Sequence, residues 1–343
     1  MLRLPHEWVS RLRPSFEGRR VCVTGGAGFI GGHLVDALLS LGASIAIIDD
    51  LSNSSSEHLG SLMDMDPDRV RFVHGSILDE SAIAEACTKA DAVFHLAAVS
   101  SVPRSVADPE RSYAVNATGT MRVAEASRRA GVKRVIYSAS SSAYGASERL
   151  PKVETDVPEP VSPYAGSKLA GEHIMQAWSH SYGLSTISLR YFNIFGPRQP
   201  ADSPYSGVIA VFAKKLLSGQ APTIFGDGLQ SRDFTYVSNA VLANLLAAVG
   251  DRAFTGEVVN IGAGEKTDLV QLARGMAEAC GSPHLKPAFQ PARAGDVKHS
   301  LADLSKARQL IGYAPIIALS DGLAQTIDWY RSVYGDQRPV SEP

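Results

Sequence analysis

Cysteine is scarce in this chain, and long apolar runs are missing from it. The 343 residues include three cysteines, Cys22, Cys87 and Cys280, which lie far apart and form no Cys-x-x-Cys pair. An odd, scattered set argues against a disulfide scaffold or a zinc site, so we expect no metal and a reducing, cytoplasmic location. The first twenty residues hold no apolar run long enough for a signal peptide or a membrane span, so we expect no membrane anchor.

An excess of either charge is also missing. Lysine and arginine number 33, aspartate and glutamate 35, and the formal net charge is −2. Binding to nucleic acid or to an acidic membrane needs a basic surface, so neither is expected as a principal function. What is present is the composition of a globular protein, with 45% hydrophobic and 20% charged residues, in a chain long enough for one large domain or two modest ones.

Short apolar runs alternate with longer helical patterns over most of the chain. The expected strands cover residues 20–24, 44–48, 70–74, 92–95, 133–138, 185–191 and 257–261, and the expected helices cover 29–40, 81–89, 110–130, 164–182 and 237–248. Apolar strands that alternate with helices are typical of a parallel sheet covered on both faces. We therefore predict an α/β fold with a doubly wound parallel sheet.

A glycine-rich turn lies between the first strand and the first of these helices. Gly25, Gly28 and Gly31 permit a tight turn, close helix packing and the approach of backbone N–H groups to a pyrophosphate. Asp49 ends the second strand, where a carboxylate accepts hydrogen bonds from an adenine ribose and repels a 2′-phosphate. A plain turn is the alternative, but the strand–turn–helix setting with Asp49 favours a dinucleotide site, and NAD over NADP.

The strand and helix pattern loosens after about residue 191, where proline-rich stretches at 196–207 and 286–300 occur. We expect residues 1–191, joined by 233–265, to form a Rossmann-type NAD-binding domain. Residues 192–232 and 266–335 are then expected to form a smaller, discontinuous C-terminal domain that binds the substrate.

A tyrosine and a lysine lie one helical turn apart in the sequence Tyr-Ala-Gly-Ser-Lys. Tyr164 and Lys168 share a helix face, and the helix follows a proline-rich segment. Ser140, Ser141 and Ser142 follow a predicted strand, and residues at this end of a parallel strand face the ligand crevice. Capping or turn formation is the alternative role for the serines. The combination of serine, tyrosine and lysine favours an active site.

The chain resembles the extended short-chain dehydrogenase/reductase family, and within it the UDP-hexose 4-epimerases, over residues 19–335. The resemblance rests on VTGGAGFIGGHL (23–34), HLAA (95–98), VNATGT (115–120), SSSAYG (140–145), YAGSK (164–168), RYFNIFGPRQ (190–199), SRDFTYV (231–237) and RAGDVKHS (293–300). One departure is Ser76, which stands where the family usually has an aspartate that contacts adenine.

The resemblance implies site residues. For the cofactor these are Gly25, Gly28, Phe29, Ile30, Gly31, Asp49, Asn53, Ser76, Ile77, Leu96, Ala97, Ala98, Asn116, Tyr164, Lys168 and Tyr191. For a UDP-sugar substrate they are Ser101, Ser140, Ser141, Ser142, Tyr164, Asn193, Gln199, Val208, Thr223, Phe225, Arg232, Arg293, Asp296 and Ser300. Ser140, Tyr164 and Lys168 are the implied catalytic residues, and the family also implies a homodimer.

The implied mechanism uses Tyr164 as the base that takes the proton from the sugar O4 while C4 gives hydride to NAD⁺. A phenol with a pKa of about 10 must be lowered by roughly three units, which requires about 4 kcal/mol. One charge about 5 Å away supplies about 3 kcal/mol at an effective dielectric near 20. Lys168 together with the nicotinamide charge is therefore expected to suffice.

Three alternatives share parts of this pattern. Nucleotide-sugar 4,6-dehydratases carry an Asp-Glu pair, and UDP-glucuronate decarboxylases a glutamate, where this chain has Ser141, Ser142 and Ala143. A non-catalytic dinucleotide-binding regulator has no need of the serine, tyrosine and lysine together.

Ser300 stands where family members restricted to plain UDP-glucose and UDP-galactose carry a tyrosine. The smaller side chain predicts interconversion of UDP-N-acetylglucosamine and UDP-N-acetylgalactosamine, with a plain UDP-hexose 4-epimerase or a UDP-glucuronate-processing enzyme as the alternative.

Overall fold

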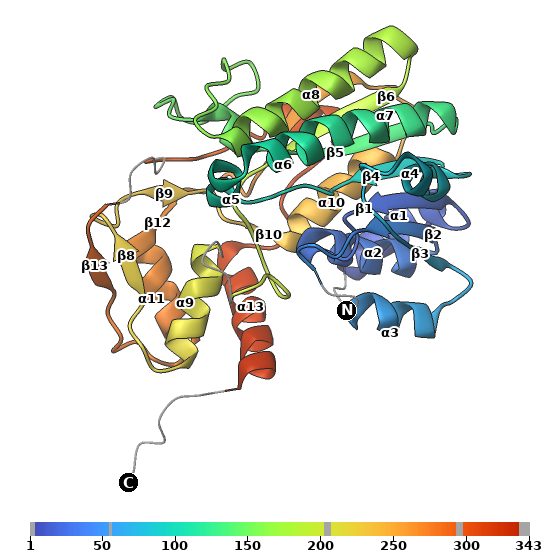
Figure 1. Ribbon diagram of the computed structural model, residues 1–343. Coiled ribbons are helices and arrows are strands. Elements are labelled where there is room, and N and C mark those ends of the chain that lie inside the picture. The colour runs from blue at the N-terminus through green and yellow to red at the C-terminus, as the bar shows by residue number, and fades with distance from the viewer. Residues whose placement is uncertain (1–3, 55–56, 202–206, 293–297, 336–343) are drawn as a thin grey trace.

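A seven-stranded parallel sheet forms the centre of the computed structural model, which describes residues 4–54, 57–201, 207–292 and 298–335 (Figure 1). Its strands lie in the order β11-β6-β5-β4-β1-β2-β3, and every neighbouring pair is parallel. Their bounds are β1 Arg20–Thr24, β2 Ser44–Asp49, β3 Val70–His74, β4 Ala92–His95, β5 Arg134–Ser140, β6 Ser185–Tyr191 and β11 Thr255–Ile261.

Helices cover both faces of this sheet, because its strands are apolar on both sides. In β1, Val21 and Val23 pack into one core and Cys22 into the other. The first core also holds residues of α1 (His6–Phe16), α2 (Phe29–Ser40) and α10 (Val237–Ala248). The second holds residues of α4 (Glu80–Cys87), α7 (Thr120–Arg129) and α8 (Pro163–Tyr182). The predicted α/β fold with a doubly wound parallel sheet is confirmed.

One predicted helix is interrupted. The sequence pattern predicts a single α-helix over residues 110–130, whereas the structure has α6 (Pro109–Tyr113), a π-helical turn η1 (Ala114–Gly119) and α7 in direct succession. A π-turn inserts one residue without breaking the apolar face, so periodicity alone does not reveal it, and such turns are frequent at functional sites. Here the turn carries Asn116.

The C-terminal region is richer in helices than its sequence pattern predicts. Beside the large sheet, Figure 1 shows small strand pairs together with α9, α11 and α13. The elements are β7 Ile194–Phe195, α9 Val208–Leu217, β8 Thr223–Phe225, β9 Ser231–Arg232, β10 Thr235–Tyr236, β12 Thr267–Asp268, α11 Leu269–Ala279, β13 Ala288–Gln290, α12 Ser305–Ile311 and α13 Leu319–Tyr334. The domain boundaries at residues 191, 233 and 265 stay a prediction.

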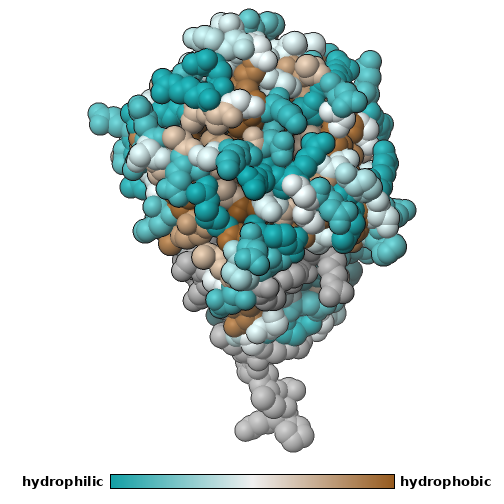
Figure 2. All heavy atoms as spheres, turned by 90° about the vertical axis from the view of Figure 1, so that its right-hand side faces the viewer, coloured by the Kyte–Doolittle hydropathy of each residue, from teal (hydrophilic) through white to brown (hydrophobic). Residues whose placement is uncertain are grey.

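The surface view in Figure 2 shows hydrophilic side chains over most of one face, with smaller apolar areas between them. Within the described ranges, no helix has both the length and the apolar character that crossing a membrane requires. The remaining short elements are α3 (Glu57–Met65), α5 (Val102–Ala107) and the 3₁₀ turn η2 (Ser141–Tyr144).

Candidate active site

A cleft of about 760 Å³ lies along the C-terminal edge of the large sheet. Gly25, Asp49 and Ser76 line it at or beyond the ends of β1, β2 and β3, and Leu96 and Tyr191 do so at the ends of β4 and β6. This edge, where the strand order reverses, is the usual ligand position in an open parallel sheet.

The glycine turn between β1 and α2 is too crowded for side chains. Gly25 has a φ of +72°, and a Cβ placed there would lie 2.7 Å from the backbone nitrogen of Ala97. A Cβ on Gly31 would lie 2.1 Å from the carbonyl oxygen of Gly25. The turn therefore presents bare backbone to the cleft in front of the α2 N-terminus, and this fits the pyrophosphate of a dinucleotide.

Asp49 holds the loops at one end of the cleft. Its Oδ2 accepts from the backbone N–H of Ala27 at 3.0 Å, and its Oδ1 accepts from Leu51 at 2.9 Å and from the Ser54 hydroxyl at 3.1 Å. A carboxylate has about four acceptor positions, so capacity remains for a ribose hydroxyl. The sequence predicts only the ribose role, and the structure adds that Asp49 shapes the turn.

Tyr164 and Lys168 come into the cleft from the first turns of α8. Ser162 caps this helix by accepting from the N–H of Ala165, and the N–H of Tyr164 donates to the Ser105 hydroxyl at 2.9 Å. Lys168 is buried, with its Nζ 4.4 Å from the centre of the Tyr137 ring. Both side chains line the cleft.

Ser140 is the last residue of β5, and its hydroxyl lies beside the Tyr164 phenol, where it acts to lower the pKa of that group. Its Oγ also accepts from the hydroxyl of Ser142 at 2.8 Å and from its N–H at 3.2 Å. Of the three predicted catalytic residues, Tyr164 and Lys168 therefore line the cleft, and Ser140 lies beside Tyr164 without being part of the cleft wall.

The pKa values of Tyr164 and Lys168 differ from those that their spacing in the sequence predicts. Burial raises the pKa of Tyr164, and the hydrogen bond from Ser140 only opposes this. Burial also lowers the pKa of Lys168 to about 7, although the carboxylate of Glu172 acts in the other direction. The lowering of the Tyr164 pKa expected from the sequence includes the attraction between the phenolate and the Lys168 ammonium, but it omits the free-energy cost of removing both groups from water. Lys168 is thus only partly charged near pH 7 in the cofactor-free protein.

The buried Lys168 predicts a pH-dependent stability difference. Its folded pKa of about 7 lies below the unfolded value of about 10.4, so the unfolded chain binds more protons between these values. The penalty for burying the ammonium is full below pH 7 and is relieved as the pH rises toward 10. The cofactor-free Lys168→Met protein should therefore melt above the wild type at pH 6.5, and this advantage should shrink by pH 9.5. Calorimetry of both proteins checks this; a constant difference would show that the buried charge is not the cause.

A buried polar chain behind the cleft was not predicted. The ring of His95 bridges the hydroxyls of Thr24, at 2.7 Å, and Thr120, at 2.9 Å, and the Thr120 hydroxyl donates to the carbonyl oxygen of Asn116. Burial, with Lys168 nearby, lowers the pKa of His95 to about 3, so the imidazole is neutral. The neutral ring fixes β1, β4 and η1 relative to one another.

Asn116 lies beside the cleft and does not line it. Its Oδ1 accepts from the N–H of Val99 at 2.8 Å, and its Nδ2 donates to the hydroxyl of Ser167 at 3.0 Å. Its amide therefore fixes the loop after β4 against α8. The other predicted cofactor residues all line the cleft, namely Gly25, Gly28, Phe29, Ile30, Gly31, Asp49, Asn53, Ser76, Ile77, Leu96, Ala97, Ala98, Tyr164, Lys168 and Tyr191.

The predicted substrate residues are less concentrated. Ser101, Tyr164 and Gln199 line the cleft, whereas Ser140, Ser141, Ser142, Asn193, Val208, Thr223, Phe225, Arg232 and Ser300 are not part of its wall. The N–H of Ser300 donates to the carbonyl oxygen of Ser231 at 3.0 Å. Because Ser231 directly precedes Arg232, this bond brings Ser300 close to Arg232. Arg293 and Asp296 lie outside the described residues.

Arg104 of α5 and Arg111 of α6 also line the cleft, although the sequence motifs do not predict either arginine as a site residue. The Nη1 of Arg104 donates to the Oδ1 of Asn53 at 2.9 Å and so connects α5 to the loop after β2. Ser101 caps α5 by accepting from the N–H of Arg104, with a proline in the first helical turn. The sequence Ser-Val-Pro-Arg carries this helix-start signal, but it does not show which side chains face the cleft.

A protein-family model named for the NAD dependent epimerase/dehydratase family matches residues 21–262. The chain belongs to this family. It is 39% identical, over 91% of its length and 99% of the relative, to a UDP-glucose 4-epimerase of Mycolicibacterium smegmatis.

Solved structures of the family are similar to the whole chain. One is a UDP-N-acetylglucosamine 4-epimerase of Methanobrevibacter ruminantium in complex with UDP-N-acetylmuramic acid, with TM-score 0.86 and 36% identity over 92% of this chain and 99% of that one. Another is a dTDP-glucose 4,6-dehydratase of Streptomyces venezuelae with NAD bound, with TM-score 0.84 and 32% identity over 92% and 98%. As a member of this family the chain is an enzyme with NAD as its cofactor.

Proposed function

We propose that this epimerase/dehydratase family member is a UDP-sugar 4-epimerase that interconverts UDP-N-acetylglucosamine and UDP-N-acetylgalactosamine, with UDP-glucose and UDP-galactose as weaker substrates. The observation that carries the proposal is that Tyr164 and Lys168 line the cleft together, with Ser140 beside the Tyr164 phenol at the end of β5. Relatives named as UDP-glucose and UDP-N-acetylglucosamine 4-epimerases support it.

In the proposed reaction, Tyr164 acts as the base at the sugar O4. Its Oη takes the O4 proton and returns it to O4 after the 4-keto sugar has turned over, so that hydride reaches C4 on the opposite face. Ser140 holds O4 beside the phenol through its hydroxyl, and the Lys168 ammonium favours the phenolate over the phenol. NAD, which the glycine turn and Asp49 would hold, would supply the acceptor and the donor for the C4 hydride. General-base catalysis of this kind contributes about 10²–10⁴-fold to the rate.

The absence of an acid beside Tyr164 separates this proposal from dehydration. Elimination of water needs a carboxylic acid and a carboxylate close to the sugar, but the turn after Ser140 reads Ser141, Ser142, Ala143. Among the described residues, the carboxylates that line the cleft are Asp49, Asp50 and Asp108. Asp49 ends β2 and Asp50 follows it, and Asp108 accepts from the N–H of Arg111 as the cap of α6. None belongs to the segment that carries Ser140.

The identity of the sugar rests on Ser300. A serine leaves space for the three additional heavy atoms of an acetamido group, which must turn over with the sugar, whereas a phenol ring would fill that space. Likeness to the UDP-N-acetylglucosamine 4-epimerase supports this assignment. The 39% sequence identity to the UDP-glucose 4-epimerase of Mycolicibacterium smegmatis supports the alternative, in which the plain sugars are the main substrates.

The test is a side-by-side assay without added cofactor. UDP-glucose, UDP-galactose, UDP-N-acetylglucosamine, UDP-N-acetylgalactosamine and UDP-glucuronate are each incubated with the purified protein, and the products are separated by chromatography. We expect the two N-acetylated sugars to interconvert fastest. Faster interconversion of the plain pair would select the alternative, and carbon dioxide release from UDP-glucuronate would indicate a decarboxylase.

We also propose a homodimer of two-fold symmetry. Four apolar side chains on α5, α6 and α8 are exposed: Val102 at 43%, Val106 at 65%, Tyr113 at 46% and Tyr182 at 56%. These helices pack against one another, so a second copy could cover them together. Light scattering at micromolar concentration should give twice the chain mass, and Val106→Asp should lower it. A monomeric mass for the wild type contradicts the dimer.

A further inference from the structure

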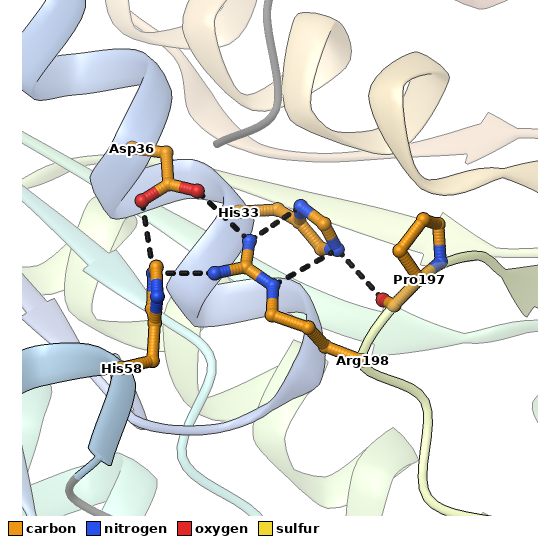
Figure 3. A network of polar contacts seen from close by, with 5 residues as sticks. All are labelled: His33, Asp36, His58, Pro197 and Arg198. Carbon is orange, nitrogen blue, oxygen red and sulfur yellow. Dashed lines mark hydrogen bonds and ion pairs between the residues drawn. The ribbon is translucent and has the colours of Figure 1, made fainter. Parts of the chain in front are cut away.

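A cluster of charged and imidazole side chains lies behind the cleft, away from the catalytic residues. His33 and Asp36 belong to α2, His58 belongs to α3, and Arg198 follows β7. In Figure 3 the guanidinium of Arg198 lies between the two imidazoles and the carboxylate. Its Nη2 donates to the Oδ2 of Asp36 at 3.0 Å, and its Nη1 meets the Nε2 of His58. The Nε2 of His58 is also 2.9 Å from the Oδ1 of Asp36.

The contacts of His33 and Asp36 with Arg198 indicate how the cluster is charged. Burial, with the charge of Arg198 adjacent, lowers the pKa of His33 to about 3, so the ring is neutral. Its Nε2–H then donates to the carbonyl oxygen of Pro197 at 2.8 Å, and its Nδ1 accepts from Arg198. The side chain of Asp36 is fully buried, and its negative charge is balanced by Arg198. A lysine has no planar fork and could not reach all three partners.

The cluster joins the walls on either side of the cleft. His33 and Asp36 lie on the helix that begins at the glycine turn, and His58 follows the cleft-lining loop of residues 49–54. Arg198 immediately precedes Gln199 and Pro200, which line the cleft from the other side. Arg198 also has a φ of +66°, a backbone conformation that a non-glycine residue keeps only where its surroundings enforce it.

We propose that Arg198 is a positioning residue. It fixes Gln199 and Pro200, which line the cleft, at the correct distance from the glycine turn and from the loop after β2. Arg198 is not part of the cleft wall, and it acts through the segments that are. The sugar part of this inference rests on the proposed UDP-sugar epimerase function, and the cofactor part does not. Removing the guanidinium should weaken the binding of both NAD and the UDP-sugar, and it should leave kcat nearly unchanged.

Three variants test this role in the NAD-loaded enzyme. Arg198→Asn removes the guanidinium but keeps a residue that tolerates positive φ. Arg198→Lys keeps a positive charge beside buried Asp36, so it is informative even where the asparagine variant does not fold. Arg71→Gln is the control, since Arg71 forms an exposed ion pair with Glu85 elsewhere in the same part of the fold.

The readouts are the rate at which NAD leaves the holoenzyme and the KM and kcat for UDP-N-acetylglucosamine. For Arg198→Asn we expect faster NAD release and a higher KM, each about tenfold, with kcat within about threefold of the wild type. Arg198→Lys should fall between, and Arg71→Gln should match the wild type. A lower melting temperature with NAD release and KM unchanged would overturn the proposal, and so would a loss confined to kcat.

The two proposals fail separately. If the wild type converts no UDP-sugar but Arg198→Asn still accelerates NAD release, the proposed function fails and the positioning role holds for the cofactor wall. If the wild type converts UDP-N-acetylglucosamine and neither NAD release nor KM responds in Arg198→Asn or Arg198→Lys, the positioning role fails alone.

Discussion

Tyr164→Phe is expected to lower kcat for UDP-sugar epimerisation by about 10²–10⁴-fold while leaving the fold and bound NAD intact. The substitution removes one oxygen from a side chain at the cleft and keeps the ring. The backbone N–H that holds the residue to Ser105 is unaffected, so α8 should start as in the wild type. Turnover is measured with a saturating UDP-sugar, and NAD content is measured on the denatured protein.

Tyr113→Phe is the matched control for this result. Tyr113 is half exposed on α6 and does not line the cleft, so loss of its hydroxyl should change turnover little. Near-native turnover in Tyr164→Phe would show that another group acts as the base. A loss of bound NAD equal to the loss of turnover would assign the effect to the cofactor site.

Ser300→Tyr is expected to lower kcat/KM for the N-acetylated sugars by about a hundredfold and for the plain pair by less than about fivefold, because steric exclusion of a small group has effects of this size. The N–H of Ser300 bonds the carbonyl oxygen of Ser231, next to Arg232, and the substitution leaves this backbone contact available. Initial rates with all four UDP-sugars, measured on one preparation, give the two ratios.

Ser300→Ala controls for the hydroxyl. It keeps the space for an acetamido group, so we expect both sugar pairs to react within about threefold of the wild type. Equal loss on both pairs in Ser300→Tyr would mean that Ser300 supports the chain locally and does not select the sugar. Absence of N-acetylated activity in the wild type would also remove the substrate assignment.

Much of the central sheet could be predicted from the sequence because its signals are local. The glycine turn between an apolar strand and an apolar helix predicts β1 and α2, and α10 was predicted with the bounds that the structure gives. The helices α9, α11 and α13 were not predicted. Their buried residues join the same core as α2 and α10, which is assembled from segments far apart in the sequence. Asp268 and Gln271 nevertheless form a capping box at the start of α11 that is readable in the sequence.

The candidate site divides in the same way. Ser140, Tyr164 and Lys168 lie in compact motifs, Ser140 at the end of β5 and the other two on the first turns of α8. The network of Arg198 with His33 joins residues 165 positions apart, and no local pattern indicates it. The pKa values of Tyr164 and Lys168 depend on burial, which is a property of the folded protein and not of the spacing between the two residues.

The most direct test of the central claim follows a deuterium atom. UDP-N-acetylglucosamine carrying deuterium at C4 is incubated with the purified holoenzyme, without added NAD, and the reaction is followed by NMR. Because the hydride should leave C4 and return to the same carbon, we predict UDP-N-acetylgalactosamine with the deuterium retained at C4. Formation of no epimer, transfer of the deuterium to C6 with loss of water, or replacement of the deuterium by solvent hydrogen would contradict the account.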